Sequence, residues 1–149
     1  MTRITRALGA AAALLSLTAL SSVALADGRD WNDGPVINVA AIRTVDGHFD
    51  DYMHWLATTW RKQQENAKAK GLILSYRVVV AEARDPHDAD IFLVTEFKNW
   101  AALDNLGGKF DQVSAEVEGS VEAASKSEVD RAKIRTVLGS RTMQEARLK

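Results

Sequence analysis

The chain contains no cysteine and only three histidines in 149 residues. The absence of cysteine excludes disulfide bonds, thiolate metal sites, cysteine nucleophiles and a lipid-modified N-terminal cysteine. Basic residues are not in excess either, because the formal net charge is −1. Phosphate binding needs a clustered basic face, so nucleic acid is not an expected partner. A domain of this size must be held together by its apolar core, with or without a partner subunit.

Motifs that carry catalysis or bind cofactors are also lacking. The sequence shows no Ser-His-Asp order, no phosphate-binding loop and no paired-carboxylate motif. His48 and His54 are six residues apart in a helical segment, which places them on different faces and excludes an i, i+4 metal pair. The sequence therefore predicts neither a metal site nor a cofactor.

The N-terminus has the features of a secretory signal peptide over residues 1–26. Arg3 and Arg6 precede an almost uninterrupted run of small and apolar residues, and small side chains at Ala24 and Ala26 mark the cleavage site. The alternative is a retained membrane anchor, but the run is too weakly apolar for a good permanent span. We expect an exported protein, periplasmic or secreted, without a stable membrane anchor after cleavage. Loss of the two arginines lowers the formal charge from −1 to −3.

The rest of the chain divides into a polar, flexible leader (27–35) and one domain (36–149). Short β-branched runs predict strands, whereas apolar residues at three- and four-residue steps predict amphipathic helices. The predicted elements are a strand over 35–45, a helix over 48–70 and strands over 72–83 and 91–97. A helical region follows from Trp100, with interruptions at Gly107 and Gly119, and continues over 125–138; a last strand is predicted over 141–148.

Strand, helix, strand, strand, helical region and strand is the split β-α-β order of a ferredoxin-like α+β fold with a four-stranded antiparallel sheet. Three stretches carry a further resemblance, namely 43–49 (Arg-Thr-Val-Asp-Gly-His-Phe), 71–76 (Gly-Leu-Ile-Leu-Ser-Tyr) and 94–100 (Val-Thr-Glu-Phe-Lys-Asn-Trp). With them, residues 36–148 resemble the dimeric α/β-barrel superfamily. The similarity is greatest to its small, secreted and largely uncharacterised bacterial members, which are similar to antibiotic-biosynthesis-type monooxygenases. The resemblance implies a homodimer in which two sheets face each other as a barrel, with the helices outside.

The strands themselves agree with this expectation. A sheet covered by helices on one side only should have one apolar and one polar face. In the strand over 72–83, however, Tyr76 and Val78 lie on one face and Val79 and Ala81 on the other, so that neither face is polar. Two apolar faces need two covers, and the helices supply only one. The second cover is either another subunit or a ligand.

Several residues are candidates for a ligand site. Strand alternation places Arg43, Arg77 and Glu96 on the less apolar, interior side, where they could orient a ligand or form a charge network satisfied at the dimer interface. On the first helix, Trp55 and Tyr52 are candidates to line a pocket mouth for a flat aromatic ligand. Trp60 lies on the main apolar stripe and is expected in the core.

The residues leave three functions open. The first is a homodimeric protein that binds a small apolar or aromatic ligand in a mostly apolar pocket between sheet and helices, next to the first helix. The second is a cofactor-independent monooxygenase or isomerase acting on an aromatic or quinone-like compound, with His54 or Glu96 as base and Tyr52 or Arg77 at the oxyanion. The third is a structural or interaction protein without a ligand.

Haem-degrading relatives in this superfamily use a helix histidine as the iron ligand. The second helical region here contains no histidine, which argues against haem chemistry.

Overall fold

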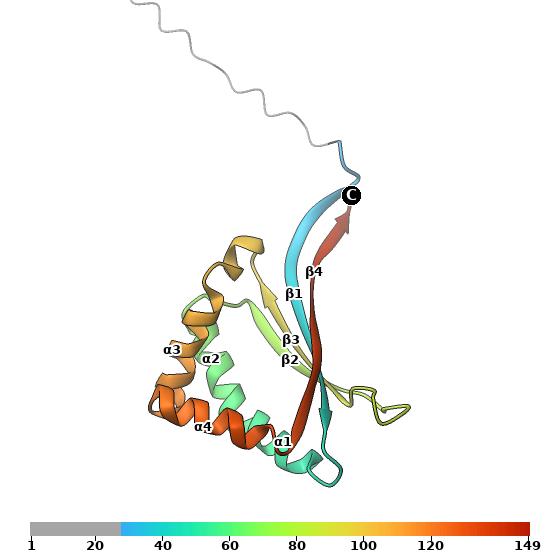
Figure 1. Ribbon diagram of the computed structural model, residues 1–149. Coiled ribbons are helices and arrows are strands. Elements are labelled where there is room, and N and C mark those ends of the chain that lie inside the picture. Colours follow the sequence, from blue (N-terminus) through green and yellow to red (C-terminus); the bar gives the residue numbers. More distant parts are fainter. Residues whose placement is uncertain (1–27) are drawn as a thin grey trace, which may run out of the picture.

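The computed structural model describes residues 28–149, so the predicted signal peptide lies outside the described residues. Helices pack on one side of a single sheet, and the other side carries no helix (Figure 1). In chain order the elements are β1 (Trp31–Thr44), α1 (Phe49–Trp55), the π-helical turn η1 (Leu56–Trp60), α2 (Arg61–Ala69), β2 (Ser75–Val80), β3 (Ile91–Phe97), the 3₁₀ turn η2 (Trp100–Leu103), α3 (Leu106–Glu118), α4 (Val121–Arg131) and β4 (Arg135–Leu148).

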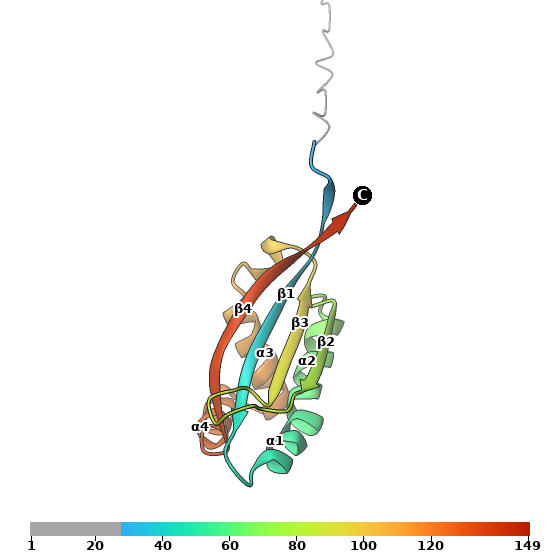
Figure 2. The same ribbon diagram turned by 90° about the vertical axis from the view of Figure 1, so that its right-hand side faces the viewer.

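The sheet has four strands in the order β2-β3-β1-β4, and every neighbouring pair is antiparallel. Seen from the open side, the strands lie in front and all helices lie behind them (Figure 2). This strand order is that of the split β-α-β arrangement. The predicted fold class, an α+β ferredoxin-like domain with a four-stranded antiparallel sheet, is confirmed.

The first helical segment forms as its apolar spacing predicts. α1, η1 and α2 follow one another without a break, which matches the helix expected over 48–70. Its apolar stripe is buried against the sheet: Leu56 is 3% exposed and Trp60 is 8% exposed. The Trp60 ring meets Tyr76 of β2 edge to face, with 5.3 Å between centroids. Gly71 ends the segment with a φ of +70°, the left-handed cap conformation that glycine adopts without strain.

The end of the chain differs from the expectation. The helix predicted over 125–138 is wrong in its second half, because α4 ends at Arg131 and β4 begins at Arg135. The β-branched Thr136 and Val137 belong to the strand, which pairs with β1 along almost its whole length. Gly139 does not end a helix. It lies at a register shift within β4 and has a φ of +148°, a conformation open to glycine.

The leader expected over 27–35 is also partly ordered, because β1 begins at Trp31. Trp31 pairs with Leu148 at the far end of β4, and together the two strands form an arm that extends beyond β2 and β3 (Figure 1). Gly34 allows this close pairing, since a Cβ atom there would lie 2.7 Å from the Glu145 side chain. The long-range partner, which local sequence does not reveal, orders the segment.

β2 is shorter than predicted. The strand covers Ser75–Val80, and Leu72 and Ile73 pack instead into one of two core clusters. That cluster joins α2, α3 and the arm side of the sheet around Val36 and Phe97. The second cluster joins α1 and η1 to the hairpin side of the sheet around Ile42. None of the helices in residues 28–149 combines the length and hydropathy that a membrane span requires.

Candidate functional site: a cavity between the sheet and α3

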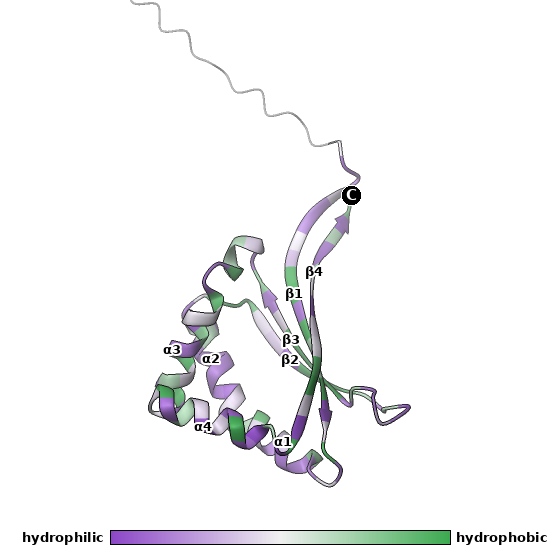
Figure 3. Cartoon of the chain, viewed as in Figure 1, coloured by the Kyte–Doolittle hydropathy of each residue, from purple (hydrophilic) through white to green (hydrophobic). Residues whose placement is uncertain are grey.

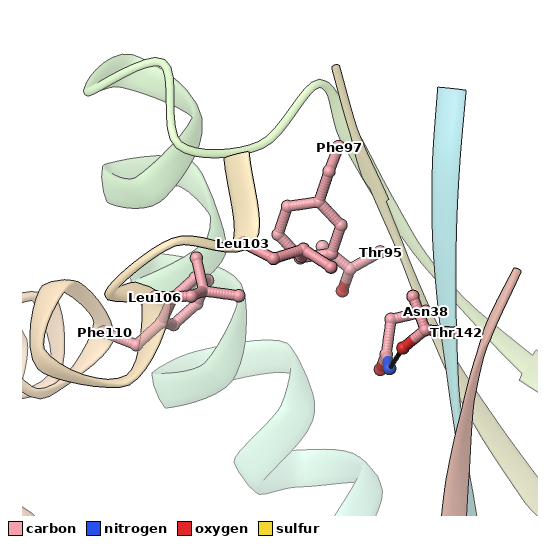
Figure 4. Close-up of a pocket in the computed structure, with 7 residues that line it drawn as sticks. All are labelled: Asn38, Thr95, Phe97, Leu103, Leu106, Phe110 and Thr142. Carbon is pink, nitrogen blue, oxygen red and sulfur yellow. Dashed lines mark hydrogen bonds between the residues drawn. The ribbon is translucent and has the colours of Figure 1, made fainter. Parts of the chain in front are cut away.

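A cavity of about 410 Å³ lies between the helix-facing side of the sheet and the segment η2–α3. Figure 4 shows side chains from the strands on one side and from the helical segment on the other. The strands contribute Asn38 of β1, Thr95 and Phe97 of β3 and Thr142 of β4, and the helical segment contributes Leu103, Leu106 and Phe110. The volume is sufficient for a small organic molecule.

The polar groups of this cavity form one row across three strands. Asn38 pairs with Thr95 on β3 and with Thr142 on β4, so the three side chains lie side by side on the same face. They come together because opposite residues of an antiparallel ladder point to the same side of the sheet. The row crosses a face that also carries buried apolar residues such as Ile42 and Ile91.

The hydrogen bond within the row does not use all of its donors and acceptors. Asn38 Nδ2 donates to Thr142 Oγ1 at 2.9 Å, while the Asn38 carbonyl oxygen accepts no hydrogen bond from residues 28–149. The Thr95 hydroxyl has no hydrogen-bond partner in that part of the chain. The row can therefore hold one or two hydrogen-bonding groups of a ligand, and Leu106 and Phe110 offer apolar surface from the helical side (Figure 4).

The lining of this cavity contains no titratable side chain. Its seven residues are two threonines, an asparagine, two leucines and two phenylalanines. General acid–base catalysis needs a group that can release or accept a proton near the operating pH. The cavity provides binding groups but no acid or base of its own.

The predicted pocket thus exists between sheet and helices, but it adjoins α3 and not the first helix. α1, η1 and α2 pack directly on β1, β2 and β3 through the core clusters. Gly107 and Gly108 lie in the first turn of α3 and do not interrupt the helix. The lining residues Asn38, Thr95 and Thr142 are ones that sequence reasoning missed. A signal was present in Asn38, a polar residue at an inward position of an apolar strand.

Arg77 and Glu96 lie on the open face, opposite the helices. Arg77 Nη1 is 2.7 Å from Glu96 Oε1, and Ser75 Oγ donates to the other carboxylate oxygen at 2.7 Å. These two hydrogen bonds, the one from Arg77 being the stronger, hold the pKa of Glu96 below its ordinary value. An ionised, ion-paired carboxylate is a weak base, and its position excludes it from the cavity under α3.

Arg43 does not join this pair. It lies at the opposite end of the strands, 3.9 Å from Asp90 and 3.7 Å from Asp46. Glu96 pairs with Ile37, six residues before Arg43 on β1, which corresponds to roughly 20 Å along the strand. The expectation that Arg43, Arg77 and Glu96 converge is therefore wrong. The three residues lie on the same face of the sheet, but Arg43 is at the opposite end of the strands from the other two.

The candidates on the first helix are separated in the same way. Tyr52 is 1% exposed and belongs to the core, so it does not line a pocket mouth. His54 is exposed to solvent on the outer side of α1 and lines none of the cavities described for residues 28–149. Trp55 stacks on Tyr52, with 5.7 Å between ring centroids, and lines a second cavity beside α4. Of the five residues predicted to bind a ligand, Trp55 lines a cavity next to a helix and Glu96 lines a separate hollow beside the arm.

The open face has an apolar centre. Val39 and Ala41 of β1, Phe92 of β3 and Met143 of β4 border a shallow depression of about 340 Å³ there. The middle of the sheet is coloured hydrophobic, in contrast to the hairpin between β2 and β3 (Figure 3). Met143 is 41% exposed in the single chain. This face matches the expectation of a second apolar surface that the helices leave uncovered.

Metal binding finds no support in the described residues. Within residues 28–149 no three histidine, aspartate or glutamate side chains are grouped so that they could hold a metal ion. His48 Nδ1 lies 2.8 Å from Asp51 Oδ2, which forms a pair on the helix surface and not a ligand set.

No protein-family model matches the chain, and no curated protein matches it in sequence. Among solved structures the chain is similar to HapK from Hahella chejuensis, with a TM-score of 0.50 and 13% sequence identity over 74% of this chain and 91% of that protein. PA3566 from Pseudomonas aeruginosa aligns with a TM-score of 0.44 and 18% identity over 78% of this chain and 96% of its own. At 13% identity the likeness to HapK concerns the fold, a four-stranded antiparallel sheet with helices that resembles dimeric α/β-barrel structures.

Proposed function

We propose that this protein is an exported homodimer that binds a small, mostly apolar molecule in the cavity between the sheet and α3. The observation that carries the proposal is the composition of that cavity. A row of uncharged hydrogen-bonding groups, Asn38, Thr95 and Thr142, faces an apolar wall, and no acid or base accompanies them. Such a site orients a ligand without transforming it.

The ligand chemistry follows from the unused groups of the row. The Asn38 carbonyl oxygen can accept a hydrogen bond from a ligand, and the Thr95 hydroxyl can donate or accept one. A neutral molecule with a hydroxyl or carbonyl group at one end and a flat or aliphatic body satisfies them. A charged ligand is disfavoured because no side chain of opposite charge lines the cavity.

The homodimer is proposed from the open face. An apolar surface around Val39, Phe92 and Met143 remains in contact with water in the single chain. A second copy related by twofold symmetry would present the same surface, and pairing the two would remove both from water. This arrangement would close two sheets into the barrel that the sequence resemblance implies.

Export is proposed from the N-terminal sequence. Arg3 and Arg6, the apolar run and the small residues before Asp27 constitute the signal. Fractionation of cells that express the full chain should recover a protein beginning at Asp27 in the periplasm or the medium. Recovery of the uncleaved chain in the membrane fraction would contradict this part of the proposal.

Native mass spectrometry of the protein purified from its own source tests the binding function. We expect a dimer that carries an additional small mass. Leu106→Trp should fill the cavity, so that the dimer persists and the additional mass is lost. Val129→Trp is the matched control, because Val129 is 64% exposed on α4 and the added ring leaves the cavity unchanged. Wild-type protein without any adduct, or an adduct that Leu106→Trp retains, would contradict binding in this cavity.

A further inference from the structure

A second cavity, also of about 410 Å³, lies between α1 and α4 and shares no lining residue with the cavity under α3. Trp55 lines it from α1, and Ala123 and Ile134 add apolar surface. Its polar lining comes from Lys126, Ser127, Asp130 and Arg131. This cavity therefore combines an aromatic and aliphatic wall with cationic side chains, unlike the uncharged cavity under α3.

Arg131 is the central cation of this cavity. Its guanidinium carbon lies 4.2 Å from the centre of the Trp55 ring, and its Nη1 donates to Ser127 Oγ at 2.7 Å. Burial lowers the pKa of Arg131 below its ordinary value. Among residues 28–149 no carboxylate lies within 4.0 Å of the Arg131 nitrogens, in contrast to Arg77 and Arg84, which each have an aspartate or glutamate partner at 2.7 to 2.8 Å.

Three buried hydrogen-bond donors in this part of the fold have no partner, and two of them belong to residues that line the cavity, Trp55 and Arg131. Trp55 Nε1, Arg131 Nε and Arg135 Nε are all shielded from solvent and make no hydrogen bond with the described residues. Arg135 lies next to the same aromatic stack, with its guanidinium carbon 5.8 Å from the Tyr52 ring. A cluster of unpaired donors next to half-buried positive charge is unfavourable unless an acceptor is supplied.

The nearby carboxylates do not supply it. Asp130 lines the cavity, but its Oδ1 is 2.7 Å from Lys133 Nζ. Glu118 accepts a hydrogen bond from Gln63 at 2.8 Å. Glu128 is 71% exposed, and its Oε1 lies 4.0 Å from Arg135 Nη2. Glu118 and Glu128 act on the charge of Arg131 from a distance and line a neighbouring cavity with it, but none of the three carboxylates lies within 4.0 Å of its nitrogens.

We propose that this cavity binds a small aromatic carboxylate. The carboxylate of the ligand accepts hydrogen bonds from the Arg131 guanidinium. It thereby acts as the counter-ion of Arg131 in place of a protein carboxylate. The ring of the ligand packs on Ala123 and Ile134 and meets the edge of the Trp55 indole, because Tyr52 and Arg131 already cover the faces of that indole. A cation that is already stacked on an aromatic ring is held in one orientation, so little freedom is lost when the anion binds. This site is independent of the function proposed for the cavity under α3.

Titration with benzoate, observed at the tryptophan indole N–H resonances by NMR, tests the proposal. The four tryptophans are assigned by single substitution with phenylalanine. We expect a saturable shift of the Trp55 resonance with benzoate, whereas Trp100 on the arm side of the fold should not respond. Benzamide has the same ring without the charge and should bind about tenfold more weakly. Inorganic phosphate has the charge without the ring and distinguishes a general oxyanion site from an aromatic carboxylate site.

Variants locate the interaction. Arg131→Gln should weaken benzoate binding about tenfold or more, because the counter-ion is lost. Trp55→Phe keeps an aromatic ring and should weaken binding about threefold; because this variant lacks the Trp55 indole N–H, its affinity is followed at the methyl resonances of Ala123 and Ile134, which also line the cavity. Arg84→Gln is the matched control, since Arg84 is an exposed arginine paired with Asp88 on the hairpin, and it should leave the affinity unchanged. Because Arg131 also links α4 to α1, the fold of each variant is checked by its methyl resonances.

Four results would overturn the proposal. The first is the absence of a benzoate-dependent shift at Trp55 in the wild-type protein, which would make the Arg131 stack a structural link only. The second is equal binding of benzamide and benzoate. The third is phosphate binding at least as tight as benzoate. The fourth is unchanged affinity in a folded Arg131→Gln variant. None of these results bears on the cavity under α3, whose test is the adduct lost in Leu106→Trp.

Discussion

The helix-covered face and the open face of the sheet carry similar apolar side chains at their centres but differ in what surrounds those side chains. On the covered face, Ile42 and Ile91 are 2% and 0% exposed beneath α1 and η1. On the open face, Val79 and Met143 are 43% and 41% exposed, with the ion pair of Arg77 and Glu96 beside them. The same strand chemistry thus forms a core on one side and an uncovered surface on the other. The difference between the faces lies in their cover, since the side chains are alike.

The largest effect is expected on the covered face. Trp60→Ala should lower the free energy of unfolding by about 3 to 5 kcal/mol, because a buried ring that meets Tyr76 edge to face is removed and a void remains. Urea denaturation followed by circular dichroism measures this change. A near-zero effect would show that Trp60 contributes little to the core and that the two faces are energetically alike.

The second effect concerns association through the open face. Phe92→Asp should weaken the dimer at least about a hundredfold, or ~2.7 kcal/mol, because a carboxylate would have to be buried at the centre of the apolar surface. Light scattering after size-exclusion chromatography, over a range of protein concentrations, measures the dimer dissociation constant. Val129→Asp on the exposed side of α4 is the control and should leave it unchanged. A wild-type monomer, or a dimer that tolerates Phe92→Asp, would mean that something other than this face holds the subunits.

A smaller effect is expected from the ion pair on the open face. The lowered pKa of Glu96 means that its interaction with Arg77 stabilises the fold at pH values above the ordinary glutamate pKa and that this contribution is lost as the pH falls below it. Glu96→Gln should therefore cost about 0.2 to 1 kcal/mol at pH 7 and less at pH 3. Denaturation at both pH values gives the difference. An equal cost at both pH values would mean that Glu96 stabilises the fold by packing and not by its charge.

The smallest effect is expected at the polar row of the covered face. Thr95→Val keeps the shape of the side chain and removes a hydroxyl that has no hydrogen-bond partner among residues 28–149. The free energy of unfolding should change by less than about 0.5 kcal/mol, while the mass bound to the dimer should be retained less well. Urea denaturation together with native mass spectrometry checks both. A stability loss above about 1 kcal/mol with full retention would assign Thr95 to the fold and not to the cavity.

Local patterns were sufficient for much of the fold. The three- and four-residue spacing in residues 48–70 predicted the first helical segment, and β3 was predicted with its observed bounds. Trp60 was placed in the core from its position on the apolar stripe, which its burial confirms. The early start of β4 was missed, because residues 132–138 are short of turn signals and their strand state depends on pairing with β1.

The candidate site was predicted less well than the fold. Strand alternation correctly placed Arg77 and Glu96 on one face, but alternation does not tell how far apart two residues lie along neighbouring strands. Arg43 was therefore grouped with a pair that lies at the other end of the sheet. The row of Asn38, Thr95 and Thr142 depends on the register of three strands, and the short sequence pattern around each residue contains no information about that register.

The sequence by itself determined the order of strands and helices, the apolar character of both sheet faces and the absence of cysteine chemistry, because these depend on composition and on periodicities of two and 3.6 residues. Only the tertiary structure decided which face the helices cover, which polar side chains meet in the cavity under α3, and that Arg131 rests on Trp55 without a carboxylate partner. Those features bring together residues that are far apart in the chain. Their positions follow from strand register and helix packing, which are properties of the whole fold.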